Sequence, residues 1–308
     1  MKSGTVAVVG KANAGKSTLV NVLVGEKVAI VSPKPQTTRD RIYGVLTTEE
    51  YQIVFEDTPG IYKASTTLNS RMQRAAESTA KETDVVLFVV DGHTGLKEDD
   101  LALAQRFAKG QVPVVVAFTK TDIMPKEKIP EELVKLAQIN GISDIVPVSA
   151  RKGRNVKELL SVILKHLPEG DYVFNPDAIS NKSEKFMIAE IMREKILLKY
   201  DREIPHGVAI TVNEFSKRPN GIYDINLDIV CEKDNHKAIL IGKQGRALKE
   251  VSSFARESME KFLGAKVFLT TYVKVKENWR DKPNLLKEYG YSNDDLGSGK
   301  DDDQGGKL

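Results

Sequence analysis

Residues Gly10 to Ser17 read GKANAGKS, and this stretch decides the fold of the first half of the chain. It matches the pattern G-x-x-x-x-G-K-[ST], and it lies between the apolar run Thr5–Val9 and a helical pattern that begins at Lys16. A glycine-rich turn between a buried strand and a helix lets backbone amides surround a polyphosphate, and the helix N-terminus favours negative charge. The stretch therefore predicts a phosphate-binding loop in an α/β domain, against the plainer alternative of a glycine-rich turn without a ligand.

The residue types in this loop have separate expected roles at a bound nucleotide. The Lys16 ammonium supplies positive charge at the β and γ phosphates, and the Ser17 hydroxyl offers an oxygen to Mg²⁺. The small residues let the backbone bend closely around the phosphates, so that N–H groups point inward. The expected nucleotide-binding residues of the loop are Gly10, Asn13, Ala14, Gly15, Lys16, Ser17 and Thr18.

Apolar, β-rich runs alternate with helical patterns outward from this loop, up to about residue 170. Several runs are apolar throughout, as in parallel strands that are buried on both faces. The repeated βα units predict a doubly wound, mostly parallel sheet, and we assign residues 1–170 to this α/β domain. The expected strands are Thr5–Val9, Tyr51–Glu56, Asp84–Asp91, Val112–Phe118 and Asp144–Val148, and the expected helices are Lys16–Val24, Thr67–Lys81, Glu98–Lys109, Glu131–Ile139 and Asn155–His166.

Three further motifs follow expected strands. They are DTPG at Asp57–Gly60, TKTD at Thr119–Asp122 and SAR at Ser149–Arg151. Because the carboxyl ends of parallel strands meet at one edge of a sheet, we expect all three beside the phosphate-binding loop. The Asp57 carboxylate can hold Mg²⁺ through water, and the Gly60 N–H can approach the γ phosphate. DTPG by itself is more often a simple turn. The prediction of a nucleotide site therefore rests on all the motifs together and on their order along the chain.

The Asp122 carboxylate indicates which base the site takes. Guanine presents an N1–H and an amino group on one edge, and a carboxylate can accept from both, whereas adenine would leave it poorly paired at a cost of about 1–3 kcal/mol or more. The stem of Lys120 can lie along the base, and the Ala150 amide can donate to the guanine O6. GTP and GDP are therefore the expected ligands, and a P-loop kinase or ATPase is disfavoured. The expected contacts at this end are Thr119, Lys120, Asp122, Ser149, Ala150 and Arg151.

Composition and charge limit the remaining possibilities. With 308 residues, 41% of them hydrophobic and 29% charged, the chain can form the cores of two domains. Its single cysteine, Cys231, excludes an internal disulfide. The longest apolar run, Val112–Phe118, is far too short to span a bilayer, so we expect a cytoplasmic protein. The net charge of +3 does not by itself indicate nucleic-acid binding, but the positive excess lies in residues 176–291.

A second, smaller α+β domain is predicted at residues 184–291. Residues 171–183 contain Pro176 among polar residues and break the helical and strand periodicity, which predicts a linker. After it, helical and alternating patterns follow one another in the order α, β, β, α, α, β. Residues 292–308 have no apolar periodicity and predict a disordered tail.

The two middle helices of this second domain are joined by Gly242–Gly245, which reads GKQG. A G-x-x-G loop between two helices is typical of KH domains, where it clamps the backbone of about four nucleotides. Residues 237–249 carry four basic side chains and no acidic one, which favours RNA over the plainer interpretation of a solvated helix face. The expected RNA contacts are Ile241, Gly242, Lys243, Gln244, Gly245, Arg246 and Lys249.

Further motifs link the two halves to one family. They are KPQTTRDRIYG at Lys34–Gly44, DTPG, YDIN at Tyr223–Asn226, the IGKQG loop and YVKVKENW at Tyr272–Trp279. With them the sequence resembles the bacterial Era family of translation-factor-related GTPases, up to about Leu296. The resemblance implies a GTP-hydrolysing P-loop domain and a type II KH domain. It also implies binding to the 3′ end of 16S rRNA, assembly of the small (30S) ribosomal subunit and peripheral membrane association, with no DNA and no required oligomer.

The same resemblance implies roles in hydrolysis. A threonine of the first switch, the segment Lys34–Gly44, binds Mg²⁺ and senses the γ phosphate in such GTPases; Thr38 is the best match and Thr37 the alternative. Asn13 carries the hypothesis of a potassium ion that supports the transition state, with a loop-shaping role as the alternative. The implied metal ligands are Ser17, Thr38 and Asp57, and the implied catalytic residues are Lys16, Thr38, Gly60 and Asn13.

Two positions depart from the usual motifs. Thr119 stands where the family's guanine motif begins with Asn, and its single hydroxyl predicts weaker base binding. Ile61 follows DTPG where Ras-type enzymes have a glutamine that orients water, and an alkyl side chain cannot do this by hydrogen bonding. We therefore expect slow intrinsic hydrolysis. The alternative function left open is a nucleotide-regulated RNA-binding scaffold with negligible GTP turnover.

Overall fold

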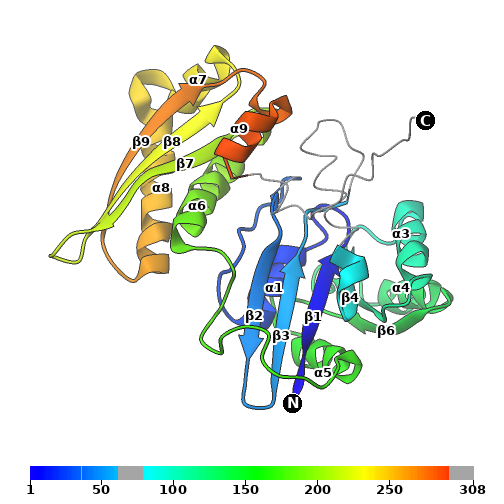
Figure 1. Ribbon diagram of the computed structural model, residues 1–308. Coiled ribbons are helices and arrows are strands. Elements are labelled where there is room, and N and C mark those ends of the chain that lie inside the picture. The colour runs from blue at the N-terminus through cyan, green and yellow to red at the C-terminus, as the bar shows by residue number, and fades with distance from the viewer. Residues whose placement is uncertain (36, 62–78, 291–308) are drawn as a thin grey trace, which may run out of the picture.

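The computed structural model describes residues 1–35, 37–61 and 79–290, which form two units that lie side by side, each with its own sheet (Figure 1). The elements of the first unit are β1 (Lys2–Val9), α1 (Lys16–Val24), β2 (Ile42–Thr47), β3 (Tyr51–Asp57), β4 (Val85–Asp91), α3 (Glu98–Ala108), β5 (Val114–Thr119), α4 (Lys128–Ala137), β6 (Ile142–Pro147) and α5 (Val156–His166). Those of the second are α6 (Glu184–Lys199), β7 (Ala209–Lys217), β8 (Tyr223–Cys231), α7 (Asp234–Ile241), α8 (Arg246–Leu263), β9 (Val267–Val275) and α9 (Pro283–Glu288), with short 3-10 helices η1 (Pro205–Gly207), η2 (Lys243–Gly245) and η3 (Trp279–Asp281).

The sheet of the first unit has six strands in the order β2-β3-β1-β4-β5-β6. All neighbouring pairs are parallel except β2 and β3, which are antiparallel. This confirms the predicted doubly wound, mostly parallel sheet. The strand β2 was not predicted, and β5 begins two residues later than expected because Pro113 has no N–H to give to the ladder.

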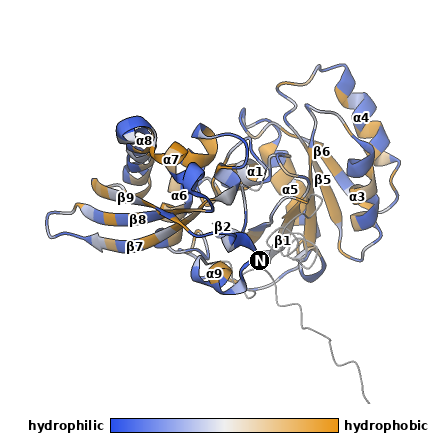
Figure 2. Ribbon diagram, turned by 90° about the horizontal axis from the view of Figure 1, so that it is seen from above, coloured by the Kyte–Doolittle hydropathy of each residue, from blue (hydrophilic) through white to orange (hydrophobic). Residues whose placement is uncertain are grey.

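Helices cover both faces of this sheet. Helices α1 and α5 pack on one face through Leu19 and Ile163, and α3 and α4 pack on the other through Ala104 and Leu136. Figure 2 shows β5 and β6 between α5 on one side and α3 and α4 on the other. The strands at the centre are buried on both faces, as their continuous apolar runs predicted, so only the loops at the strand ends are left to bind a ligand.

The predicted linker at residues 171–183 contains no helix or strand and lies along β2 and β3. The Gln52 side chain accepts from the Phe174 N–H at 2.8 Å and donates to the Phe174 carbonyl at 2.9 Å. The Val45 N–H donates to the Ile179 carbonyl at 2.8 Å. These contacts attach the connection to the edge of the first sheet.

The second unit has a three-stranded sheet in the order β7-β8-β9, in which β7 and β8 are antiparallel and β8 and β9 are parallel. Helices α6 and α8 cover one face, and their shared core includes Ile191, Leu227, Val251 and Ala255. The predicted order α, β, β, α, α, β is confirmed. The additional helix α9 follows these elements, and Trp279 and Leu286 pack together with Val230 in a smaller cluster.

Two expected features fall outside the described residues. They are the tail 292–308 and all but the last residues of the helix expected at Thr67–Lys81. Within the described ranges, no helix combines the length and the apolar composition that a bilayer span requires.

Candidate functional site

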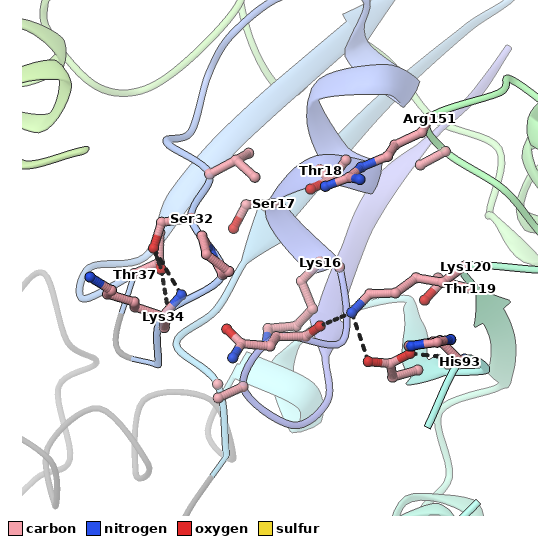
Figure 3. A pocket seen from close by; sticks show the side chains of 18 of the residues that line it. Lys16, Ser17, Thr18, Ser32, Lys34, Thr37, His93, Thr119, Lys120 and Arg151 are labelled. Carbon is pink, nitrogen blue, oxygen red and sulfur yellow. Dashed lines mark hydrogen bonds and ion pairs between the residues drawn. The ribbon is translucent and has the colours of Figure 1, made fainter. Parts of the chain in front are cut away.

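A cavity of about 630 Å³ lies at the carboxyl edge of the six-stranded sheet and reaches Leu198 of α6. This volume is typical of a small-molecule site. Figure 3 shows the side chains of its wall, with Lys16 near the centre and Lys120 and Arg151 at one end. The predicted residues on the wall are Asn13, Gly15, Lys16, Ser17, Thr18, Thr38, Gly60, Thr119, Lys120, Asp122, Ala150 and Arg151. Four others, Gly10, Ala14, Asp57 and Ser149, lie directly behind it and contact wall residues.

The backbone of the phosphate-binding loop takes conformations that favour glycine and asparagine. Gly15 has φ 99° and Asn13 has φ 64°, both in the left-handed region. A Cβ at Gly10 would lie 2.3 Å from the Val89 carbonyl oxygen, so the loop passes β4 too closely for any side chain. Gly15 directly precedes α1, whose first N–H groups have no partner within the helix. The loop therefore has the shape and the donors that a polyphosphate requires.

The Lys16 side chain folds back across this loop and is only 6% exposed. Its Nζ donates to the carbonyl oxygens of Gly10 at 3.1 Å and Lys11 at 3.0 Å. Burial lowers the pKa of Lys16 to about 8, although the nearby Asp57 carboxylate opposes the shift. A phosphate group in the cavity would favour the charged ammonium, so Lys16 is placed to stabilise a polyphosphate.

Three oxygen-bearing side chains meet beside the loop. The Ser17 Oγ lies 2.7 Å from the Asp57 Oδ2 and 2.8 Å from the Thr38 Oγ1, which itself donates to the same carboxylate at 3.3 Å. Burial raises the pKa of Asp57, while Lys16 and the two hydroxyls oppose this shift. Its Oδ1 is buried without a hydrogen-bond partner among the described residues. Hard oxygen ligands of this kind fit Mg²⁺.

Thr37 and Thr38 differ in what their hydroxyls contact. The Thr37 hydroxyl lies 2.9 Å from the Ser32 Oγ and donates to the Lys34 carbonyl at 2.6 Å. Since only the Thr38 hydroxyl lies with Ser17, the geometry favours Thr38 over the alternative as the magnesium ligand of the first switch.

The DTPG segment contacts the phosphate-binding loop through its backbone. The Ile61 N–H donates to the Gly10 carbonyl at 3.1 Å, and a Cβ at Gly60 would lie 2.7 Å from the Ala12 Cα. Only glycine therefore allows this approach. The Ile61 side chain is 9% exposed and does not line the cavity.

The base end of the cavity is held by polar contacts between loops. The Ser149 hydroxyl donates to the Asp122 Oδ1 at 2.7 Å, and this hydrogen bond holds the pKa of Asp122 below its usual value. Ser149 thus orients Asp122 from behind the wall. The Lys120 Nζ donates to the Asn13 carbonyl at 2.7 Å and pairs with Asp91 at 2.7 Å, which joins the base end to the phosphate-binding loop.

Residues 30–34 and Leu198 form a part of the wall that was not predicted from the sequence. The side-chain oxygen of Asn21 accepts from the Val28 and Ala29 N–H groups, each at 3.0 Å, and so fixes the chain that enters this wall. Leu198 belongs to α6 in the second unit. No pattern in the sequence places a helix of one domain against the cavity of the other. Ala12, Asp91, His93, Thr94 and Ile123 also line the wall and were not predicted.

The first switch is bound by the second unit through Arg39. This side chain is 1% exposed and donates to the carbonyl oxygens of Val208 at 2.7 Å and His206 at 2.8 Å. Its guanidinium lies 5.9 Å from the centre of the Trp279 ring. Arg193 of α6 donates to the Thr37 carbonyl. The residues on both sides of Thr38 therefore contact the second unit.

Lys34 and Glu194 make further contacts between the two units. Lys34 pairs with Asp201 at 2.8 Å and donates to the Tyr200 carbonyl, while the Tyr200 hydroxyl donates to the Leu240 carbonyl at 2.8 Å. The buried Glu194 of α6 pairs with Lys27 at 2.9 Å and accepts from the Val31 N–H at 3.1 Å. Burial opposes ionisation of Glu194, but these partners hold its pKa below the usual value.

The predicted RNA loop joins α7 to α8 in a tight turn. Gly242 has φ 72°, Gln244 has φ 56° and Gly245 has φ 74°. A Cβ at Gly242 would lie 2.6 Å from the Ala247 Cβ, so this position requires glycine. Lys243, Gln244, Arg246 and Lys249 are exposed around the turn. The loop thus presents three positive side chains beside the start of α8.

Comparisons with known proteins assign both units. Residues 5–120 match the family described as 50S ribosome-binding GTPase, and residues 203–280 match the KH domain family. The GTPase Era of Clostridium kluyveri is 43% identical over 291 residues, which cover 94% of this chain and 99% of that relative. The chain belongs to the Era family of GTPases. The GTPase Era of Clostridium botulinum is 42% identical over 292 residues, with similar coverage.

Solved Era structures agree with this assignment over both domains. A single-residue variant of Aquifex aeolicus Era bound to GDP and AlF4⁻ is 39% identical, with a TM-score of 0.90 over 95% of this chain and 100% of that chain. An Era complex with MgGDPNP and nucleotides 1506–1542 of 16S ribosomal RNA is 39% identical, with a TM-score of 0.90 over 95% of this chain and 99% of that chain. The predicted architecture of a P-loop GTPase domain and a KH domain is therefore confirmed.

Proposed function

We propose that this Era-family GTPase is a GTP-controlled switch that binds the 3′ end of 16S rRNA through its KH domain and acts in assembly of the small ribosomal subunit. The observation that carries the proposal is the contact between the first switch and the KH domain. Arg39, which follows the magnesium ligand Thr38 of the first switch, is held by the Val208 and His206 carbonyl oxygens. A change at the γ phosphate that moves Thr38 would therefore also move Arg39 and its contacts with the RNA-binding domain.

At the nucleotide site, we assign the phosphates to the loop Gly10–Ser17 and the guanine base to Asp122. Ser17, Thr38 and Asp57 would hold Mg²⁺, which would neutralise charge on the β and γ phosphates. The Lys16 ammonium would bind the same phosphates. Asn13 is the proposed potassium contact, and its backbone is already fixed by the bond from Lys120.

At the RNA site, we assign the phosphates to Lys243, Arg246, Lys249 and the backbone of Gly242–Gly245. Ile241 and the half-exposed Ile239 lie in the same region and offer apolar surface for bases. The family description of residues 5–120 names the large subunit, whereas the relative that matches both domains was solved with 16S rRNA. We follow the match over both domains and propose the small subunit, in the cytoplasm, with peripheral membrane contact as a weaker implication of the family.

The proposal is tested by charge reversal in the RNA loop. Lys243→Asp combined with Gln244→Asp keeps both glycines and places negative charge where we expect phosphate, so affinity for a short RNA with the 16S 3′ sequence should fall at least tenfold at fixed salt. Lys217→Asp with Ser216→Asp makes the same charge change at exposed positions of β7 and should leave binding within about twofold. Equal losses in both variants would remove the loop from the RNA site.

The number of GTP molecules hydrolysed per protein distinguishes this function from that of a nucleotide-regulated scaffold. Membership in the family makes the chain a GTPase, and the expected slow intrinsic rate follows from Ile61. Phosphate release should continue over many turnovers with GTP in excess. Release of no more than one phosphate per protein would favour the scaffold.

A further inference from the structure

Thr119 ends β5, where it is 2% exposed on the wall of the nucleotide cavity. Its Oγ1 lies 2.7 Å from the Ala14 carbonyl oxygen and 2.9 Å from the Val90 carbonyl oxygen. A threonine hydroxyl has one hydrogen to donate, and carbonyl oxygens only accept. Whichever way the hydroxyl turns, its hydrogen is donated to one of these two backbone carbonyls, in the phosphate-binding loop or in β4.

Guanine offers only acceptors, N7 and O6, on the edge that faces away from its N1–H and amino groups. A hydroxyl whose hydrogen is already donated has only lone pairs left, and lone pairs cannot bind these atoms. The neighbouring Lys120 gives two of its three N–H groups to the Asn13 carbonyl and to Asp91, each at 2.7 Å, and these contacts hold its Nζ toward the phosphate-binding loop and β4. The O6 has a separate proposed donor, the Ala150 amide.

We propose that Thr119 is a positioning residue that fixes the phosphate-binding loop at Ala14, and that it makes no hydrogen bond to the guanine N7. The inference rests on the guanine site proposed above. The site then accepts guanine nucleotides that lack N7, such as 7-deaza-GDP, as readily as GDP. Selectivity for guanine comes from Asp122 and the opposite edge of the base.

An asparagine at this position would behave differently. Its amide has two N–H donors, so one can bind the Ala14 carbonyl while the second remains for N7. Residue 119 therefore determines whether N7 is read. A threonine at this position only fixes the phosphate-binding loop. An asparagine would fix the loop and also bind the base at N7.

The test compares the affinities of the full chain for GDP and 7-deaza-GDP at fixed Mg²⁺ concentration. The wild-type protein should bind the two within about twofold of each other. Thr119→Asn should bind GDP about fivefold more tightly than 7-deaza-GDP, in the range of one ordinary hydrogen bond. A wild-type preference of fivefold or more for GDP, or equal affinities in Thr119→Asn, would overturn the assignment.

Two further variants test the positioning role. Thr119→Val has nearly the same shape but no donor, and it should weaken GDP and 7-deaza-GDP equally, by roughly fivefold or more, because the Ala14 carbonyl loses its partner. Thr119→Ser keeps the hydroxyl and should restore most of the affinity. Thr119→Val with wild-type affinity would overturn the positioning role.

A control with IDP separates this inference from the guanine site on which it rests. IDP lacks the 2-amino group but keeps N7, so Asp122 predicts weaker binding of IDP than of GDP. Equal binding of IDP and GDP would refute the guanine site itself. A preference for GDP over IDP together with a preference over 7-deaza-GDP would refute only the statement about N7.

Discussion

We propose that base selectivity depends on the Asp122 carboxylate. The bond from Ser149 keeps it ionised and aimed at one position. Asp122→Asn presents an amide that donates where the carboxylate only accepts, so preference should move from guanine to xanthine nucleotides by at least tenfold. Competition between GDP and XDP measures this ratio. Unchanged preference for GDP would remove Asp122 from the base site.

Asn13 allows a test of the potassium hypothesis with little disturbance of the backbone. Because its φ is 64°, glycine can replace it without strain. Wild-type GTP hydrolysis should be severalfold faster in KCl than in NaCl, and Asn13→Gly should hydrolyse GTP at the same rate in both salts while binding GDP nearly normally. A salt preference that survives the substitution would support the loop-shaping role instead.

The sequence predicts those functional residues that belong to short motifs with a fixed spacing along the chain. The phosphate-binding loop, Asp57 and Asp122 follow strand ends, and the fold brings strand ends together. Leu198 and Glu194 could not be predicted in this way, because their roles depend on how α6 of the KH domain is placed against the GTPase domain. A helix pattern shows which side is apolar, but it does not show which surface that side meets.

We propose that Tyr200, the residue that follows helix α6, forms a route between the nucleotide site and the RNA loop. The Tyr200 carbonyl accepts from Lys34 of the first switch, and its hydroxyl donates to Leu240, two residues before Gly242. Burial raises the pKa of Tyr200 to about 12, so its hydroxyl remains a donor at working pH.

Tyr200→Phe should therefore reduce the effect of a GTP analogue on RNA affinity by threefold or more, without changing affinity for the analogue. The RNA affinity of the variant, with and without the analogue, measures the effect. Tyr172→Phe is a matched control, since it removes a hydroxyl that donates to the Thr48 carbonyl, away from both sites. If both variants keep the full nucleotide effect, the route through Tyr200 is wrong.

Strand β2 and helix α9 could not be predicted from the sequence, for physical reasons. Strand β2 is a short antiparallel edge strand inside a motif-rich segment, and its register depends on β3 and on the contact with Ile179. Helix α9 has six residues, too few to show a helical period, and it is held by the packing of Leu286 beside Trp279. The buried strands of the first sheet were predicted closely because their apolar patterns are local.

The interface between the two domains predicts a pH effect on the whole molecule. Burial lowers the pKa of His206, and Arg39 lowers it further, with smaller effects in the same direction from Arg280 and Lys34 and an opposing one from Glu203. The unfolded chain then binds more protons than the folded one just below the ordinary histidine value near 6.5. The free energy of unfolding therefore rises with pH through this window and is lost as pH falls.

The melting temperature of the nucleotide-free protein should consequently drop between about pH 7.5 and about pH 5.5, and His206→Gln should reduce that drop. His93→Gln, an exposed substitution in the GTPase domain, should leave the drop unchanged. An equal drop in wild type and His206→Gln would show that His206 does not contribute.

We propose that this one chain couples a GTP site to an RNA site. The most direct measurement is the affinity for a short single-stranded RNA with the 16S 3′ sequence, at one salt concentration, for protein with a non-hydrolysable GTP analogue, with GDP or without nucleotide. The contacts of Lys34, Thr37 and Arg39 with the KH domain predict tighter RNA binding with the analogue than in the other two states. Equal affinity in all three states would contradict the coupling.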